Sequence, residues 1–294
     1  MPLLAVPNVS EGRDPQRIAT LEEAFGSGAT LLDRHFDADH NRSVFTIAGS
    51  RDSILEALAR GAEEAIRAID VTAHEGAHPR IGALDVCPVV WLEEGDRAAA
   101  RAAALEVAER IGGLGVPVFL YGDLATEPGH AERAYFRSGG LEGLERRMKS
   151  GELRPDRGPD LPHPTAGATL VTARPPLAAF NVELESGDVD VARAVADSLR
   201  EAGGGPAGVR ALGLELSSGR VQVSTNVHDP IAVPLGDVVE LIRELAEAFD
   251  VQPVEAELIG LVPRAALRDY PADVPIRGFE RERHVIEERL SALA

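Results

Sequence analysis

The sequence has 294 residues, with 48 acidic against 30 basic side chains and a formal charge of -18 at pH 7. This length is enough for two compact domains, and a hydrophobic fraction of 44% provides the side chains for packed cores. The negative charge argues against nucleic acid as a partner, because binding to a phosphate backbone depends on clustered Lys and Arg. Composition thus excludes a disordered tail and a fibre, and it disfavours a nucleic-acid binder.

The chain shows no sign of export or membrane insertion. Its single cysteine, Cys87, cannot form an internal disulfide. The start, MPLLAVPNVSEGR, lacks the basic and apolar regions of a secretory signal. No apolar run reaches the roughly 18 residues of a membrane span, and the strongest, at 83–92, is broken by Asp85. These features predict a soluble, cytoplasmic protein without membrane contact.

The first half alternates short β-rich runs with longer helical segments. Asp14 precedes Pro15, a pair typical of a helix start. Likewise Asp52 or Ser53 opens the next amphipathic segment. The predicted strands are 3–9, 29–36, 43–49, 84–92 and 116–122, and the predicted helices are 14–26, 51–68, 95–112 and 130–150, the last with a break at Gly139 and Gly140.

The second half repeats the β-α-β-β-α-β order without repeating the sequence. It begins with a strand at 178–184, and Asp188 is the expected N-cap of the following helix. The predicted strands are 178–184, 209–216, 221–227 and 254–262, and the helices are 188–202 and 235–249. The fold class is therefore α+β (α/β): two tandem ferredoxin-like βαββαβ subdomains, at 1–177 and 178–294, with antiparallel or mixed sheets facing a substrate groove.

A proline-rich segment at 150–169 separates the two halves. It has no apolar periodicity, and its prolines and glycines favour a stiff, extended backbone with free amides. A loop of this kind suits the wall of a site for a planar ligand better than a flexible tether.

His74-Glu75-Gly76-Ala77-His78 matches the H-E-x-x-H pattern of zinc proteases. That chemistry needs a helix, because only helical spacing brings both histidines to one metal. Pro79 disfavours helical geometry for the residue before it, and Gly76 weakens the turn. The segment is predicted to be a loop, so a zinc hydrolase is the weaker alternative and no metal is expected.

Eight ordered blocks resemble the glutamate formiminotransferases, which stand alone in bacteria and form the amino-terminal part of animal formiminotransferase-cyclodeaminases. The resemblance covers almost the whole chain. The blocks are VPNVSEGR at 6–13, HNRSVFTIAG at 40–49, IDVTAHEGAHPRIGALDVCP at 69–88, GVPVFLYG at 115–122, the glycine- and proline-rich stretch at 158–169, AFNVEL at 179–184, VQVSTNVHDP at 221–230 and ELIGLVPRAAL at 257–267.

The resemblance implies an enzyme that transfers the formimino group of N-formimino-L-glutamate to tetrahydrofolate, its co-substrate, in histidine degradation, and that forms a homodimer. The catalytic histidine of the family maps onto His78. Its folate-contacting loop maps onto Gly158, Pro159, Asp160, Leu161, Pro162, His163, Pro164, Thr165, Ala166 and Gly167. The chain departs from the animal pattern at His35 and at Ala77, where a glutamate partner for the histidine is missing.

An imidazole can take a proton from an attacking nitrogen and return it to a leaving amine, which suits His78 to this transfer. Both substrates carry carboxylates, so an acidic protein must gather arginines locally to bind them. The candidate substrate-binding residues are Arg42, Arg80, Asn41, Asp85, Arg174 and Asn181. Asp85 interrupts an apolar strand and either orients His78 or caps the loop before it. The alternatives to transfer are a paralogue acting on 5-formyl-tetrahydrofolate and a folate carrier without turnover.

Overall fold

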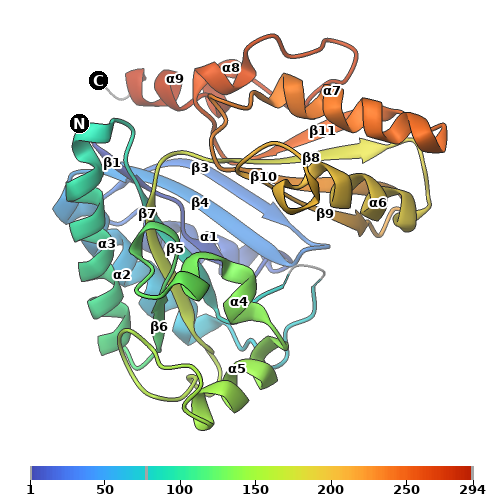
Figure 1. Ribbon diagram of the computed structural model, residues 1–294. Coiled ribbons are helices and arrows are strands. Elements are labelled where there is room, and N and C mark those ends of the chain that lie inside the picture. The colour runs from blue at the N-terminus through green and yellow to red at the C-terminus, as the bar shows by residue number, and fades with distance from the viewer. Residues whose placement is uncertain (1, 77–78, 293–294) are drawn as a thin grey trace. The chain divides into compact units, whose positions relative to one another are not determined.

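A computed structural model describes residues 2–76 and 79–292 of the chain. The chain forms two compact units, Met1–Arg174 and Pro175–Ala294 (Figure 1). Both units combine helices with a β-sheet, as the predicted α+β class requires.

The first unit is built on a seven-stranded mixed sheet. Its order is β1-β4-β2-β5-β7-β6, and β3 pairs with β4. The β5–β7 and β6–β7 pairs are parallel, whereas β1, β2, β3 and β4 pair antiparallel. The strands are β1 Leu3–Ala5, β2 Asn8–Val9, β3 Thr30–Asp37, β4 Arg42–Gly49, β5 Leu84–Val90, β6 Val118–Leu120 and β7 Thr169–Arg174.

Helices cover this sheet on two faces with separate apolar clusters. Along β6, Val118 and Leu120 belong to the cluster packed by α1, α2 and α3, whereas Phe119 between them belongs to the cluster packed by α4 and α5. Alternate side chains of a strand point to opposite faces, so the two helix groups lie on opposite sides of the sheet. The helices are α1 Pro15–Phe25, α2 Arg51–Ala68, α3 Arg97–Gly113, α4 Arg133–Arg137 and α5 Gly140–Lys149.

The helix starts follow the expected capping chemistry, with one correction. Asp14 caps α1 by accepting from the backbone N–H groups of Gln16 and Arg17. The α2 cap is Ser50, whose hydroxyl accepts from the N–H of Ser53, so neither Asp52 nor Ser53 is the N-cap as the sequence suggested.

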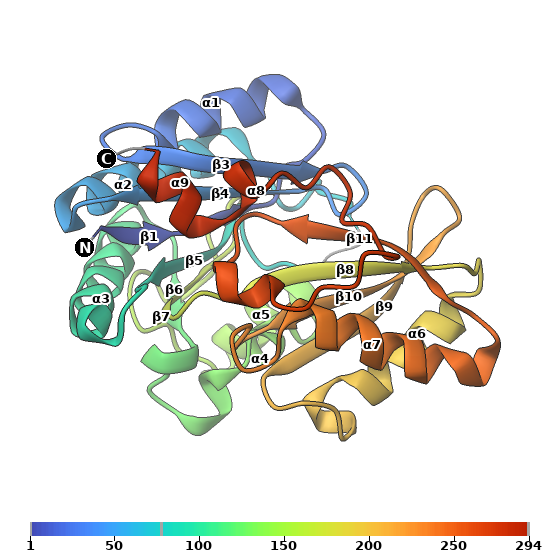
Figure 2. The same ribbon diagram turned by 90° about the horizontal axis from the view of Figure 1, so that it is seen from above.

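The second unit has the order β8-α6-β9-β10-α7-β11. Its four strands are all antiparallel, in the order β11-β8-β10-β9. Alternate side chains of β8, including Phe180 and Val182, pack with α6 and α7 in a single core. The two helices lie side by side (Figure 2). The elements are β8 Ala178–Leu184, α6 Val189–Leu199, β9 Val209–Glu215, β10 Val221–Val227, α7 Leu235–Ala246 and β11 Pro253–Ile259, followed by α8 Arg281–His284 and α9 Ile286–Ser291.

Three features differ from the sequence expectation. Pro7, which lacks an N–H, lies between β1 and β2, so the predicted strand at 3–9 is two short strands. The segment after the proline-rich loop, TLVTAR, forms β7 and pairs with both β5 and β6. The helices α8 and α9 also went unpredicted, because their length is too short for a clear periodic signal.

None of the helices in the described ranges is long and apolar enough to cross a membrane.

Candidate active site

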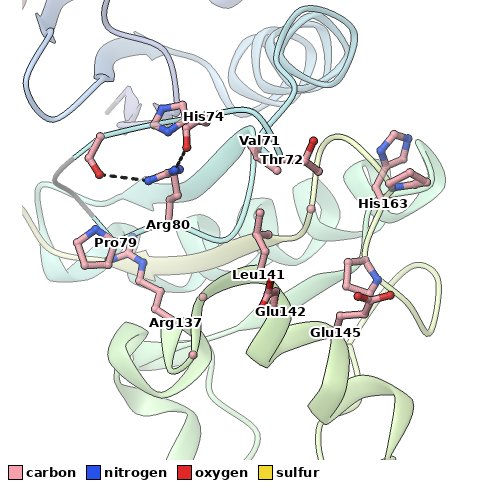
Figure 3. Close-up of a pocket in the computed structure, with 16 residues that line it drawn as sticks. Val71, Thr72, His74, Pro79, Arg80, Arg137, Leu141, Glu142, Glu145 and His163 are labelled. Carbon is pink, nitrogen blue, oxygen red and sulfur yellow. Dashed lines mark hydrogen bonds between the residues drawn. The ribbon is translucent and has the colours of Figure 1, made fainter.

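A pocket of about 670 Å³ lies in the first unit (Figure 3). Three segments form it: the loop after α2, the stretch from the end of α4 into α5, and the last part of the proline-rich loop. Its lining is Val71, Thr72, His74, Gly76, Pro79, Arg80, Arg137, Gly139, Gly140, Leu141, Glu142, Glu145, Pro162, His163, Pro164 and Gly167.

The predicted loop at 69–83 is non-helical in its described part, so the H-E-x-x-H letters lack the helix that a zinc site of that type needs. Arg80 fixes the loop from inside: its guanidinium donates to the carbonyl oxygens of His74 and, at 3.3 Å, of Gly76 (Figure 3). Gly76 is required because an added Cβ would lie 2.5 Å from the His40 carbonyl oxygen. The candidate base His78 lies outside the described residues, and its described neighbours Gly76 and Pro79 line the pocket.

Asn41 connects this loop to the start of the chain. It adopts a φ of 47°, its Oδ1 accepts from the Gly12 N–H at 2.9 Å, and its Nδ2 donates to the Glu75 carbonyl at 2.9 Å. The His74 Nε2 lies 2.8 Å from the Asn41 carbonyl oxygen. The Asn41 amide is thus engaged by protein on both sides, and the structure supports a positioning role for it.

The same contact sets the tautomer of His74. A carbonyl can only accept, so His74 Nε2 carries the proton and the lone pair lies on Nδ1. Burial lowers the pKa of His74, and the nearby charge of Arg80 lowers it further, which favours the neutral ring. His74 Nδ1 is buried and has no hydrogen-bond partner in the part of the chain that the structure describes.

Asp85 is fully buried, and a β-bulge directs its side chain. Asn8 pairs with Val86 while Val9 pairs with Leu84, so Asp85 is the extra residue on β5. Bulges re-aim side chains in this way, often beside active sites. Asp85 Oδ1 accepts from the Ile81 N–H at 2.8 Å, which is the loop-capping role considered from the sequence. Whether it also orients His78 involves a residue outside the described ranges.

The other oxygen of Asp85 holds two arginines. Oδ2 accepts from Arg42 Nη1 at 2.9 Å and from Arg137 Nη2 at 2.5 Å. The opposite edge of Arg42 donates to Asn8 Oδ1 from Nε and Nη2. Burial lowers the pKa of Arg42 to about 10, against the attraction of Asp85 and together with repulsion from Arg137. Positive charge is therefore concentrated around one carboxylate.

Two further arginines extend this charge, Arg133 on α4 and Arg174 at the end of β7. Burial lowers the pKa of Arg174 to about 10, and Arg133 adds to the lowering. Burial also lowers the pKa of Arg133, with a contribution from Arg137. Of the predicted arginines, Arg80 alone lines the pocket, and Arg42 joins it through Asp85 and Arg137. Sequence reasoning missed Arg133 and Arg137, although their spacing of four on a short helix is a detectable signal.

The proline-rich loop reaches the pocket with its second part. His163 and Gly167 exchange backbone hydrogen bonds of 2.8 and 2.9 Å, and the His163 Nδ1 accepts from the Ala166 N–H at 3.0 Å. Gly167 has a φ of 67°, and a Cβ there would lie 2.1 Å from the Ile81 carbonyl oxygen. The Thr165 carbonyl accepts from the Val71 N–H at 2.8 Å, which joins this wall to the loop after α2.

Only part of the predicted folate loop is pocket lining. Pro162, His163, Pro164 and Gly167 contribute to it, whereas Leu161 is 47% exposed. Among the residues that the structure describes, the pocket lining does not include the other members of this loop, which are Gly158, Pro159, Asp160, Thr165 and Ala166.

The remaining candidate, Asn181, belongs to the second unit. It lies on β8, and its Nδ2 donates to Glu257 Oε2 at 3.2 Å. The structure places it in a different unit from the residues around the pocket.

Within 2–76 and 79–292, no three His, Cys, Asp or Glu side chains converge as a metal site. Asp37 and His40 form a pair, with Oδ1 2.7 Å from Nδ1. Cys87 is buried, and burial raises the pKa of its thiol to about 12, so the thiolate is disfavoured.

The mixed sheet and the pocket, whose lining includes Arg80 and Arg137, define the first unit as an α+β domain with a candidate ligand site. Comparison with known families makes this specific: the formiminotransferase domain, N-terminal subdomain, matches residues 3–174, and the formiminotransferase domain matches residues 179–287. The chain belongs to the formiminotransferase family, which confirms the resemblance seen in the sequence.

Individual relatives agree over nearly the whole chain. The chain is 39% identical over 290 residues to the glutamate formimidoyltransferase of Streptococcus pyogenes serotype M1, covering 97% of each. It is 34% identical to the glutamate formimidoyltransferase of Thermoplasma acidophilum, covering 98% of this chain and 97% of the relative. The formimidoyltransferase-cyclodeaminase of Sus scrofa is 37% identical, and there the match covers 91% of this chain and 51% of the relative.

Proposed function

We propose that this protein is a glutamate formimidoyltransferase, which moves the formimino group of N-formimino-L-glutamate to tetrahydrofolate and releases L-glutamate. The observation that carries the proposal is the match at 39% identity over 97% of both chains to a relative of that name. The arginine cluster beside the pocket supports it independently, because glutamyl substrates are polyanions.

The reaction exchanges one C–N bond for another. A ring nitrogen of tetrahydrofolate attacks the formimino carbon, and the resulting tetrahedral species breaks the bond to the glutamate nitrogen. The attacking nitrogen loses one proton and the departing amine gains one. A single base within reach of both nitrogens can carry that proton, and His78 is the residue proposed for this role.

The loop that carries His78 is restrained on both sides by described residues. Arg80 binds the His74 and Gly76 carbonyls, and Asn41 binds Glu75. Asp85 holds the Ile81 N–H on the far side of Pro79. Restraint of this kind favours catalysis because a base must be held within hydrogen-bond distance of the transferred proton.

The proposal includes the division of the pocket between the substrates. His163 lies at one side of the pocket and Arg80 and Arg137 at the other, with Leu141 between them (Figure 3). We assign the planar folate to the ring and aliphatic surface of the segment that carries Pro162, His163 and Pro164, and the carboxylates to the arginine side. We propose in addition that the chain works in the cytoplasm as a homodimer, that its two units are ferredoxin-like subdomains, and that no metal takes part.

The test is a spectroscopic transfer assay with N-formimino-L-glutamate and tetrahydrofolate. The wild-type protein should turn over, and His78→Ala should lose at least about 100-fold in kcat, a typical contribution of a general acid–base group. His284→Ala, which removes an imidazole from α8 of the second unit, is the matched control and should keep full activity. Unchanged turnover in His78→Ala would overturn the assigned base, and turnover of 5-formyl-tetrahydrofolate instead would overturn the donor.

A further inference from the structure

Arg133 and Arg137 lie one turn apart on α4, so their side chains share a helix face. Their environments differ. Arg137 is bound to Asp85, whereas Arg133 interacts with Asp85 and Glu132 only at longer range and shows no hydrogen bond or ion pair among the described residues. A guanidinium has five donors, so the whole fork of Arg133 is open to an external acceptor.

The surroundings of Arg133 make it costly to leave the donors of its guanidinium without an acceptor. Its side chain is half-buried, next to Arg137 and to Tyr121, which is itself 8% exposed. Tyr121 and Phe136 belong to the apolar cluster beneath α4. A cation in such surroundings loses hydration, and repulsion from Arg137 adds to the cost, while Tyr121, Asp85 and Glu132 offset part of it without a direct hydrogen bond. An anion bound there would relieve both.

The anion can also contact the neighbouring arginine. Arg137 lines the pocket, and its Nε is buried without a hydrogen-bond partner in the described ranges. Among the described residues, Asp85 accepts a hydrogen bond from Nη2 of Arg137, which leaves Nε of that guanidinium for another acceptor. Two arginines with donors of this kind match the planar, two-oxygen geometry of a carboxylate.

We propose that Arg133 and Arg137 form a subsite for a glutamyl carboxylate, with Arg133 as the principal ligand. This inference rests on the proposed function, because that function supplies a substrate with a glutamyl group. N-formimino-L-glutamate and the tail of tetrahydrofolate share this chemistry. Asp85 then has a second role: it fixes Arg137 beside Arg133 before the substrate arrives.

The experiment compares Arg133→Gln and Arg133→Lys with wild type. Arg193→Gln is the control, since Arg193 is an exposed helical arginine of the second unit. Steady-state assays give KM for both substrates, and calorimetry gives the affinity for L-glutamate. Arg133→Gln should raise KM for N-formimino-L-glutamate by about 10-fold or more and weaken L-glutamate binding in parallel, the loss expected for one charge-assisted contact. Arg133→Lys should recover part of the loss.

The outcomes separate the possible errors. A rise in KM for tetrahydrofolate alone would assign the subsite to the folate tail. Unchanged KM values with unchanged L-glutamate affinity would overturn the subsite. Wild type that binds L-glutamate through Arg133 but shows no transfer would leave the subsite standing and overturn the proposed function. The thermal midpoint of Arg133→Gln should not fall, because Arg133 has no partner among the described residues; a clear fall would indicate a structural role instead.

Discussion

Each unit contains a buried carboxylate that holds two arginines, and the two clusters differ in exposure. In the first unit Asp85 is 0% exposed at its side chain, and its partners Arg42 and Arg137 are 11% and 10% exposed. In the second unit Glu183 is 5% exposed, but its partners Arg220 and Arg277 are 58% and 47% exposed. Water reaches the guanidinium groups of the second cluster and hardly those of the first.

The clusters also differ in charge balance. Arg277 binds Glu255 as well as Glu183, so the second cluster has two carboxylates for two arginines. In the first cluster Arg42 and Arg137 share one oxygen of Asp85, with Arg133 close by. A balanced, hydrated cluster serves as a structural contact. A buried cluster with excess positive charge is suited to receive an anion, which is the binding role proposed above for the arginines of the first unit.

The largest predicted effect is on the free energy of unfolding, when the carboxylate at the centre of each cluster is neutralised. Asp85→Asn leaves two buried guanidinium groups without their anion and should lower the free energy of unfolding by about 3–5 kcal/mol. Glu183→Gln leaves partners that water can solvate and should cost only about 1 kcal/mol. Urea unfolding of both variants measures the difference. Glu56→Gln is the control, since Glu56 forms an exposed pair with Arg60 on α2.

Equal losses for Asp85→Asn and Glu183→Gln would contradict the comparison, because they would show that the exposure of the arginines does not decide the cost. The control should stay within about 0.5 kcal/mol of wild type, as exposed helical pairs do.

A third acidic side chain, Asp37, sharpens the comparison through pH. Its side chain is 31% exposed, more than that of Asp85 or Glu183, and it accepts from both the ring and the backbone N–H of His40. Burial alone would raise the pKa of Asp37, but these hydrogen bonds lower it from 3.8 to about 2. The stabilisation is therefore complete above pH 3.8 and is lost as the pH falls through about 2.

Asp37→Asn should accordingly be less stable than wild type by about 1–2 kcal/mol at pH 6, after allowance for solvent screening of a partly exposed pair. The gap should close as the pH approaches 2, because the wild-type carboxyl is then protonated. Chemical unfolding at several pH values between 2 and 6 tests this. A gap that stays constant across that range would show that the pair contributes nothing through its charge.

Periodicity and capping residues were sufficient to predict most of the fold. Asp14, Asp188 and the apolar spacing of 51–68 gave helix positions close to those observed. The parallel strand β7 was missed because its pairing with β5 and β6 is set by residues more than forty positions away in sequence, which local pattern does not record.

Individual charged residues of the candidate site could be named from the sequence, but the contacts between them could not. Asp85 could be named because it interrupts an apolar strand, and Arg42 because anionic substrates require arginines, but their pairing depends on a bulge that no local signal shows. Arg80 was expected to bind substrate; it lines the pocket, and its contacts with the His74 and Gly76 carbonyls, which no local pattern indicates, also restrain the loop. The spacing of four between Arg133 and Arg137 was visible in the sequence, but nothing local shows that their helix lies beside Asp85.

The smallest predicted effect separates the two clusters by salt. At about 1 M ionic strength the Debye length is about 3 Å, so exposed charges are screened while buried ones are largely protected. The loss caused by Glu183→Gln should shrink by about half in 1 M NaCl, whereas the loss caused by Asp85→Asn should be unchanged. Urea unfolding in low and high salt, with wild type measured in each, gives both differences. If salt reduced the two losses by the same fraction, the arginines around Asp85 would have to be as hydrated as Arg220 and Arg277, and the contrast between a binding cluster and a structural one would fail.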